Sequence, residues 1–379
     1  MDFDLTEEQS MLKEALQRLL RDKYDFDTRN KVLASSEGWS TGMWDQLAEM
    51  GLMALPFAEE DGGLGGGMVD QMIVMEELGR ALSLEPFFGT IVLGGAALRI
   101  ACTPEQRAEL VPQVAEGSLK LALAHTERHS RFDLHHVETS ATRDGEGYKL
   151  SGEKSVVLDG DSADKIFVTA RTGGSARDRQ GIGLYLIDAG SDGVTRRGYA
   201  NQDGRRSAEI VLENVRAEAV CGDPENALPA VEWIADQGIA ALCAESIGVM
   251  SVLHETTTEY LKERKQFGVP IGAFQVLQHK AVDMFVSLEQ ARSITMYAAM
   301  MADSDDAVER SRAMAAAKIE IGRGGRVCGE NAVQLHGGVG MTMEFAVGHY
   351  FKRMTMIDKT LGDTDHHMER LAEMGGLFE

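Results

Sequence analysis

The stretch KIFVTARTGGSARDRQGIGLYLI, residues 165–187, decides the fold class of this chain. Its two ends, 165–170 and 183–187, are short runs of branched and aromatic residues, and the connection between them is rich in glycine and charged residues. Similar runs occur at 148–150 and 209–212, and this pattern predicts β-strands. Because the segments between the strands are too short for crossover helices, we expect an antiparallel sheet and no Rossmann-type cofactor site.

Helical sequence flanks this sheet on both sides. Before it, apolar residues recur at helical spacing after Thr6, which forms a capping-box pattern with Gln9. After it, the stretches 229–265, 274–301 and 306–335 are rich in Ala, Met, Leu and Glu, so we expect them to pack as a bundle. The predicted class is α+β, mostly α, with an N-terminal helical domain at 1–115, a middle antiparallel β domain at 116–225 and a C-terminal helical bundle at 226–379.

The composition argues against several classes of partner. The 379 residues carry 38 Lys and Arg against 60 Asp and Glu, a net charge of −22, so neither nucleic acid nor an anionic membrane is expected as a partner. We find no apolar stretch of the ~18 residues that a membrane span needs, and the acidic start of the chain is unlike a signal peptide. We therefore expect a cytoplasmic protein. The four cysteines lie far apart in the sequence, which predicts neither a disulfide framework nor a zinc site.

Two short clusters contain residues suited to a phosphate-bearing ligand with a flat ring. The sequence RKQFG, from Arg264 to Gly268, ends a predicted helix, and a guanidinium group beside a phenyl ring fits a diphosphate next to a ring system. The sequence QLHGGVG, from Gln334 to Gly340, has paired glycines that let backbone amides approach a ligand. Taken alone, each cluster is more often structural: the first as a helix end with a surface ion pair, the second as a helix C-cap.

Two other clusters are weaker candidates for binding. The glycine-rich sequence DGGLGGG at 61–67 lacks the Lys and Ser or Thr of a P-loop, so a flexible loop between helices is the preferred interpretation. His366 and His367 are adjacent in the sequence, and adjacent residues on a helix point about 100° apart. We therefore expect no metal site.

In their order and spacing, the RKQFG and QLHGGVG clusters and several other stretches resemble the acyl-CoA dehydrogenase family of flavoproteins over essentially the whole chain. The other matching stretches are Thr103–Gln106, Ala115–Gly117, Leu123–Glu127, Gly152–Lys154, Asp159–Gly160, Phe274–Gln275 and Asp363–Thr364. Within the family, the chain is similar to the small subunit of pimeloyl-CoA dehydrogenase and to the partner subunits of heteromeric steroid side-chain dehydrogenases.

The resemblance implies an oxidoreductase that introduces an α,β double bond into an acyl-CoA thioester, in fatty acid or steroid side-chain β-oxidation. It implies a C-terminal four-helix domain, FAD bound at a subunit interface, and an electron-transferring flavoprotein as acceptor. It assigns cofactor contacts on the adenosine and diphosphate side to Arg264, Gln266, Phe267, Gln275, Gln334, Gly337 and Gly338, and further contacts to Thr126 and Thr364.

The chain departs from the family pattern at the catalytic base. In the family a Glu removes the α proton, and desolvation raises its pKa towards the working pH. That position reads Gly362 here, and the alternative position used by some relatives falls near Gly238. Asp363 and Asp236 are the nearest carboxylates and the candidate substitutes, although a shift of one residue on a helix turns the side chain by about 100°.

The chain also departs from the family where the flavin ring would bind. In the loop that begins at Thr126, the family's Gly and Ser have become Arg131 and Phe132. On the strand beyond it, the family's Trp and Thr have become Val156 and Leu158. These changes would fill or loosen a ring pocket.

Together these differences predict a subunit of a hetero-oligomer. The chain keeps the residues that, in the family, contact the adenosine and diphosphate of the FAD bound to the neighbouring subunit. It has lost the catalytic Glu and the residues that would bind the flavin ring of its own FAD. The expected partner is a homologous subunit that carries the ring pocket and the catalytic Glu. Two alternatives stay open: a self-sufficient homodimeric dehydrogenase or oxidase with an Asp base, and a non-catalytic acyl-CoA-binding scaffold subunit.

Overall fold

The computed structural model describes residues 5–375 of the chain. The chain divides into two compact units. The helical unit comprises Met1–Lys31, Met68–Ser83 and Ile239–Glu379, and the sheet unit comprises Val32–Gly67 and Leu84–Gly238. The division into three domains at about residues 115 and 225 stays a prediction.

The helical unit contains the long helices expected from the C-terminal sequence. Its helices are α1 (Glu7–Lys23), most of α2 (Phe26–Leu33), α4 (Met68–Ala81), most of α7 (Leu228–Glu263), α8 (Gln275–Met301), α9 (Ala307–His336), α10 (Ala346–Lys359) and α11 (Thr364–Glu373). The short hairpin of β9 (Lys265–Gln266) and β10 (Val269–Pro270) connects α7 to α8. The predicted capping box at the start of α1 is confirmed, because Thr6 and Gln9 bond to each other's backbone.

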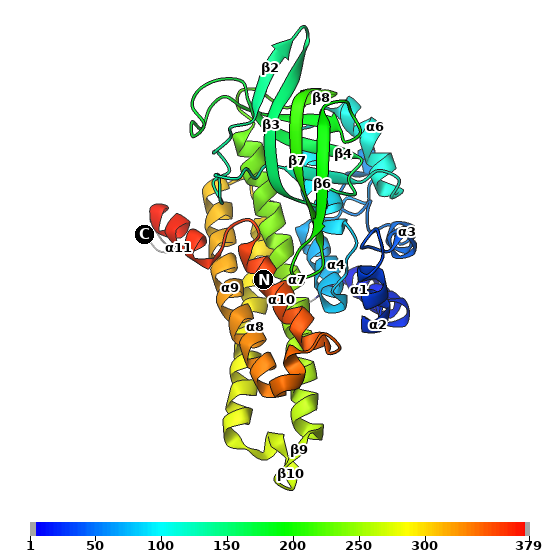
Figure 1. Cartoon of the computed structure of the whole chain (residues 1–379), viewed down its shortest axis with the longest axis vertical. Coiled ribbons are helices and arrows are strands. Elements are labelled where there is room, and N and C mark those ends of the chain that lie inside the picture. The colour runs from blue at the N-terminus through cyan, green and yellow to red at the C-terminus, as the bar shows by residue number, and fades with distance from the viewer. Residues whose placement is uncertain (1–4, 376–379) are drawn as a thin grey trace. The chain divides into compact units, whose positions relative to one another are not determined.

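The helices of this unit approach one another closely where they carry glycine. α8 and α9 run side by side, and α10 and α11 both pack on α9 (Figure 1). A Cβ on Gly248 of α7 would lie 2.0 Å from the backbone oxygen of Glu76 on α4, and a Cβ on Gly325 of α9 would lie 2.0 Å from Cε of Met354 on α10. At Gly248 only glycine fits, because the close neighbour is backbone, whereas at Gly325 a larger residue would require the Met354 side chain to move.

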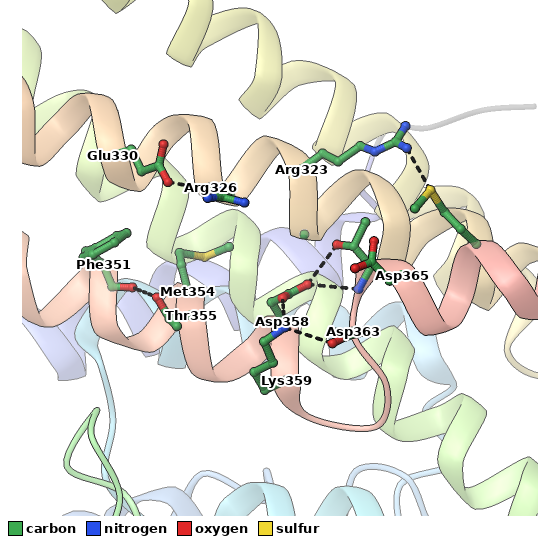
Figure 2. Close-up of a pocket in the computed structure, with 14 residues that line it drawn as sticks. Arg323, Arg326, Glu330, Phe351, Met354, Thr355, Asp358, Lys359, Asp363 and Asp365 are labelled. Carbon is green, nitrogen blue, oxygen red and sulfur yellow. Dashed lines mark hydrogen bonds and ion pairs between the residues drawn. The ribbon is translucent and has the colours of Figure 1, made fainter. Parts of the chain in front are cut away.

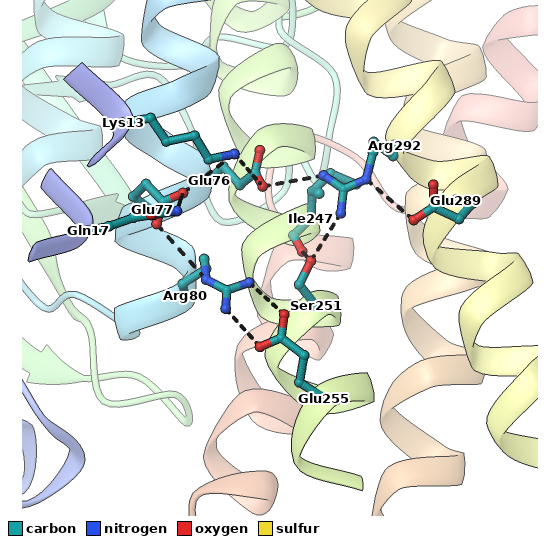
Figure 3. Close-up of polar contacts among 10 residues, drawn as sticks. All are labelled: Lys13, Gln17, Glu76, Glu77, Arg80, Ile247, Ser251, Glu255, Glu289 and Arg292. Atoms are coloured by element: carbon teal, nitrogen blue, oxygen red, sulfur yellow. Dashed lines mark hydrogen bonds and ion pairs between the residues drawn. The ribbon is translucent and has the colours of Figure 1, made fainter. Parts of the chain in front are cut away.

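A network of ion pairs and hydrogen bonds joins α1, α4, α7 and α8 (Figure 3). Glu76 accepts from Lys13 and from Arg292, each at 3.3 Å, and Arg292 also donates to the hydroxyl of Ser251 at 3.3 Å. Arg80 forms a two-pronged pair with Glu255, with contacts of 2.8 and 3.1 Å. Because the partners come from different helices, the network fixes the register of the four helices.

The sheet unit contains the predicted strands. They are β1 (Leu121–Ala124), β2 (Ser140–Asp144), β3 (Gly147–Leu158), β4 (Lys165–Arg171), β5 (Ile182–Asp188), β6 (Val194–Ala200), β7 (Arg206–Arg216) and β8 (Ala219–Cys221). β4 and β5, the strands of the opening stretch, pair antiparallel over their whole length, and the spatial order is β6-β7-β3-β2-β4-β5-β8. The prediction of an antiparallel sheet is wrong at β4, which pairs in parallel with β1 and, through Ser140 and Arg171, with β2.

Helices also belong to the sheet unit. They are α3 (Thr41–Glu49), a π-helix at Phe88–Gly94, α5 (Gly95–Ala101) and α6 (Pro104–Ala115). A parallel pair such as β1 and β4 needs a long connection, and the chain between them supplies it by forming β2 and β3. The class predicted from the sequence, α+β and mostly α, is confirmed.

A buried arginine organises the loops beside β4. The guanidinium group of Arg171 donates hydrogen bonds to six backbone oxygens at 2.7 to 3.4 Å, those of His135, Val137, Gly173, Ala176, Asp178 and Gln180. These oxygens come from the loops before β2 and between β4 and β5. One side chain therefore holds two loops together in the sheet unit.

The glycine-rich segment at 61–67 connects η1 (Glu59–Asp61) to α4 as a turn whose backbone is hydrogen-bonded to residues 54–57, and its flexibility stays a prediction. The amides of Leu64, Gly65 and Gly66 donate to backbone oxygens of residues 54–57 at 2.7 to 3.0 Å. A Cβ on Gly63 would lie 2.1 Å from the oxygen of Phe57. The glycines serve this close backbone approach.

Helix α7 corrects the expectation that no segment is long and apolar enough to cross a membrane. It contains an 18-residue window with a mean hydropathy of 1.2. However, 89% of that window is buried inside the protein, as in the core helix of a globular domain.

Candidate functional site

In the helical unit, the candidate ligand-binding residues around Arg264 lie on an exposed hairpin at one end of the bundle. Phe267 and Gly268 form its tip, and both have positive φ, +54° and +80°, as a type I′ turn requires. This conformation leaves Phe267 90% exposed, with its ring edge-on to Phe274 at 6.2 Å. Arg264 and Gln266 are exposed, and the Arg264 guanidinium has no hydrogen bond or ion pair with any residue in 5–375.

The two clusters singled out in the sequence lie at the same end of the bundle. Tyr260, one turn before Arg264, stacks on His336 with ring centroids 4.4 Å apart, and His336 directly precedes Gly337. Gln334, Gly337 and Gly338 are exposed, and a Cβ added to either glycine would meet no atom of residues 5–375 within 4 Å. Gly337 has φ +61°, which favours glycine at this helix end.

This end of the bundle fits an anion next to a flat ring. Gln275 begins α8, a helix of 27 residues whose N-terminus receives no side-chain cap from the part of the chain that the structure describes, so its first amides are left for a ligand. Arg264 adds a guanidinium group without a partner in the described chain, and Phe267 and Phe274 add aromatic faces. In addition, the buried Nε2 of His336 has no hydrogen-bond partner within residues 5–375. These residues could hold the diphosphate and adenosine of FAD.

In the same unit, the loop that carries Gly362 leaves no room for a side chain. Gly362 has φ +105°, and a Cβ there would lie 2.5 Å from Nε2 of His367 and 2.6 Å from Cδ2 of His366. His367 is fully buried and hydrogen-bonds the oxygen of Leu361 at 3.0 Å. Burial lowers the pKa of His367 to about 3, so its ring is neutral and Nε2 donates.

A buried lysine fixes this loop from the other side. Nζ of Lys318 on α9 donates to the backbone oxygens of Ile357, Asp358 and Gly362 at 2.7, 3.0 and 2.8 Å. Burial lowers the pKa of Lys318 to about 8. Lys318 and His367 together hold the loop in the shape that excludes a Cβ. Lys318 was not singled out in the sequence, and His367 was considered only as a metal ligand.

The candidate bases have structural contacts of their own. Asp363 is the N-cap of α11, where it accepts from the amide of His366 at 3.0 Å and from Nζ of Lys359 at 2.9 Å. Burial acts to raise the pKa of Asp363, but these hydrogen bonds and the charge of Lys359 lower it below the ordinary value. Asp236, in the sheet unit, is 1% exposed on α7. A carboxyl group with a lowered pKa such as that of Asp363 is a poor general base.

Thr364 lines a cavity of about 530 Å³ between α9, α10 and α11 (Figure 2). Its hydroxyl donates to Asp358 at 2.9 Å. The charged side chains of the lining are the basic Arg323, Arg326 and Lys359 and the acidic Glu330, Asp358, Asp363 and Asp365. Lys359 bridges Asp358 and Asp363, and Arg326 pairs with Glu330 at 2.7 Å. The acidic side chains outnumber the basic ones and form ion pairs with two of the three. This cavity therefore does not fit a diphosphate.

In the sheet unit, Thr126 already makes a hydrogen bond within the chain, and Val156 has a strained backbone. The hydroxyl of Thr126 hydrogen-bonds Nε2 of His125 at 3.2 Å, and burial lowers the pKa of His125 to about 4, which keeps its ring neutral. Val156 has φ +51° at a register shift of β3 and is 46% exposed. A β-branched residue is strained in this conformation. Phe132 is half-buried in the loop that follows Thr126.

A buried ion pair that the sequence did not point to anchors this loop. Nζ of Lys154 lies 2.6 Å from Oε1 of Glu127 and donates to the hydroxyl of Thr169 at 3.0 Å. Glu127 also accepts from the amides of Glu138 and Thr139 at 2.6 and 3.0 Å. The pair therefore holds both ends of the segment 127–139 against β3.

We expect this ion pair to contribute to acid denaturation. Burial acts to raise the pKa of Glu127, but the charge of Lys154 and the hydrogen bonds from Lys154, Thr139 and Glu138 lower it below its ordinary value of 4.5. The stabilisation is therefore present above about pH 4.5 and is lost as the pH falls through the lowered pKa of the folded state. Urea unfolding measured between about pH 6 and pH 3 should show a flatter decline for the double variant Glu127→Gln/Lys154→Met than for the wild type. Equal slopes would contradict this role.

Among residues 5–375, no group of three or more His, Cys, Asp or Glu side chains is arranged to hold a metal ion. The rings of His366 and His367 lie edge-on with centroids 5.1 Å apart, and Nε2 of His367 is hydrogen-bonded to the backbone oxygen of Leu361.

Comparison with known proteins gives matches along the whole chain. Three family models match: "Acyl-CoA dehydrogenase, N-terminal domain" at residues 6–118, "Acyl-CoA dehydrogenase, middle domain" at 122–215 and "Acyl-CoA dehydrogenase, C-terminal domain" at 229–375. The acyl-CoA dehydrogenase IpdE2 of Mycobacterium tuberculosis is 31% identical over 92% of this chain and 91% of its own.

Two solved structures superpose on almost the whole chain. A variant of the steroid ACAD Tcur3481-Tcur3483 superposes with a TM-score of 0.88 at 29% identity, covering 97% of both chains. The FAD complex of PigA superposes with a TM-score of 0.90 at 26% identity, covering 99% of this chain and 100% of that one.

Proposed function

The chain belongs to the acyl-CoA dehydrogenase family of FAD-dependent oxidoreductases, and on that basis we propose that it is the subunit of a hetero-oligomer that completes FAD sites on a homologous partner. The partner supplies the flavin-ring pocket and the catalytic Glu. The single observation that carries the proposal is the geometry of Gly362, the position of the family's Glu, where a Cβ would lie 2.5 Å from a buried histidine.

The adenosine side of the site supports the same division of roles. When bound, FAD supplies the acceptor for the hydride that leaves the β-carbon of the acyl thioester. The Arg264 guanidinium would bind its diphosphate, Phe267 would cover the adenine, and the uncapped N-terminus of α8 would add backbone donors. Arg264 and Phe267 are exposed on the hairpin, so they are available to a cofactor seated on another subunit.

An exposed apolar surface supports a protein partner. Val282, Phe285 and Val286 follow one another at helical spacing on α8 and are 57%, 49% and 47% exposed. Apolar side chains gathered on one helix in this way mark a protein interface more often than a solvated surface. We propose that the homologous subunit covers this row.

One similar solved structure supports a class of substrate. The Tcur3481-Tcur3483 structure is named as a steroid ACAD, and its name joins two components. We therefore extend the proposal to an acyl-CoA thioester with a fatty or steroid-derived chain. We further propose that the reaction takes place in the cytoplasm with an electron-transferring flavoprotein as acceptor.

Replacing the candidate bases tests the proposal against a self-sufficient enzyme. Asp363→Asn keeps an N-cap residue on α11, so the fold should survive. In the co-purified complex, we expect Asp363→Asn and Asp236→Asn to leave turnover within a few-fold of the wild type. Loss of a general base costs on the order of 10²–10⁴ in rate. A loss of that size in either variant, with FAD content unchanged, would favour the homodimeric alternative.

A further inference from the structure

Two cysteines that are distant in the sequence meet in the sheet unit. Cys102 follows the last residue of α5, and Cys221 is the last residue of β8, 119 positions further along the chain. Their sulfur atoms are 3.6 Å apart, and the residues are 7% and 0% exposed. The spacing of the cysteines in the sequence did not indicate this contact.

The backbone around both thiols is held in place. Cys221 pairs with Leu184 of β5, and the side-chain amide of Gln106 donates to the oxygen of Val220 at 3.3 Å. On the other side, Arg107 donates to the oxygen of Cys102 at 2.9 Å. The thiols therefore stay in contact as long as the joint between α5, α6 and β8 is intact.

The distance is short enough for a bond to form with little movement. A disulfide has sulfur atoms about 2.05 Å apart, so the two sulfurs must approach by about 1.5 Å. Rotation about the side-chain bonds of the cysteines can supply part of this, and β8 lies at an edge of the sheet, with a neighbouring strand, β5, on one side.

The other cysteines make no such contact. Cys243 on α7 and Cys328 on α9 are also buried, and in residues 5–375 neither sulfur lies against another thiol. The thiol of Cys328 donates to the backbone oxygen of Met284 at 3.3 Å. These two residues serve as internal controls for any oxidation experiment.

We propose that Cys102 and Cys221 form an intramolecular disulfide when the protein meets hydrogen peroxide. In the first step one thiol sulfur attacks the peroxide, breaks its O–O bond, and gives a sulfenic acid and one water molecule. In the second step the other thiol displaces the hydroxyl of the sulfenic acid, forms the S–S bond, and releases a second water molecule. Overall, two thiols are oxidised by two electrons and one peroxide is reduced to two water molecules.

The disulfide would tie α5 and α6 to the edge strand of the sheet. It joins positions that are 119 apart in the sequence, and a cross-link over such a long loop removes much conformational freedom from the unfolded chain. We expect the thermal midpoint of unfolding to rise by about 2–6 °C on oxidation and to return on reduction.

Counting thiols tests the proposal. The intact protein is treated with hydrogen peroxide under native conditions, unfolded in the absence of reductant, and titrated for free thiols. The wild type should fall from four thiols to two, and tryptic mapping should find a peptide that joins Cys102 to Cys221. The control Cys328→Ser should likewise lose two thiols and form the same cross-linked peptide.

Two variants separate the proposed pair from general oxidation. Cys102→Ser and Cys221→Ala each leave one member of the pair, and after the same treatment each should form no cross-linked peptide and show no rise in thermal midpoint. Circular dichroism checks that both variants fold. Four free thiols in the oxidised wild type, or a cross-link that involves Cys243 or Cys328, would overturn the proposal.

Discussion

Gly362→Ala should destabilise the protein by about 2–5 kcal/mol, because the added Cβ overlaps buried atoms and the backbone leaves the region that side chains tolerate. Gly362 has φ +105°, and His367, which the new Cβ would meet, is fully buried and hydrogen-bonded. Gly362→Glu, which would restore the family's catalytic residue in sequence, should be at least as destabilising and should give no turnover. Urea unfolding of each variant and a turnover assay of the chain by itself check both expectations.

Gly62→Ala is the matched control for backbone strain alone. Gly62 has φ +90°, but a Cβ there would meet nothing within 4 Å among the described residues. We expect it to cost about 1–2 kcal/mol, which is less than Gly362→Ala. If the two variants lose the same stability, the packing around residue 362 is not what excludes a side chain, and the structural argument against a base at this position fails.

Arg264→Ala should lower the affinity of the assembled complex for FAD by roughly ten- to a hundredfold. A hydrogen bond between a charged donor and its acceptor contributes about 1.5–3 kcal/mol, and each 1.4 kcal/mol is about a factor of ten in affinity. The guanidinium has no partner within residues 5–375, so its replacement disturbs no ion pair of the fold. FAD retained after gel filtration, and titration of the apo complex with FAD, give the measurement.

Two variants at the same helix end refine this experiment. Lys262→Ala removes an exposed cation two residues away, which pairs only with Glu259 in the described chain, and should leave FAD affinity unchanged. Arg264→Lys keeps the charge but loses the planar guanidinium, so its FAD affinity should lie between those of the wild type and Arg264→Ala. If Arg264→Ala retains full FAD content, the chain contacts no flavin through this residue, as the scaffold alternative predicts.

Most of the fold could be predicted from the sequence because its periodicity is local. The runs at 165–170 and 183–187 became β4 and β5, and the stretch 306–335 became α9 almost to the residue. Strand and helix formation here depend on neighbouring residues and on caps, which a single sequence displays. The parallel pairing of β1 with β4 was missed because it joins segments that lie far apart in the chain, such as Leu121 and Lys165.

Only the part of the candidate site that depends on local sequence motifs was predicted. Arg264 and Gly337 were singled out from short motifs, and the structure brings their ends of α7 and α9 together through Tyr260 and His336. Lys318 and the pair of Glu127 and Lys154 were not recognised as structural anchors, because a charged residue that folding buries looks like any surface residue in a sequence. The positive φ of Gly362 is likewise a property of the folded loop.

The FAD content of the chain, alone and in complex, decides between the proposed heteromer and a self-sufficient enzyme. The chain is expressed by itself and together with a homologous acyl-CoA dehydrogenase subunit, and FAD is counted per polypeptide by absorbance after denaturation. We expect a colourless protein when the chain is alone and one FAD per heterodimer in the complex. One FAD bound at full occupancy to each copy of the chain alone would contradict the proposed function.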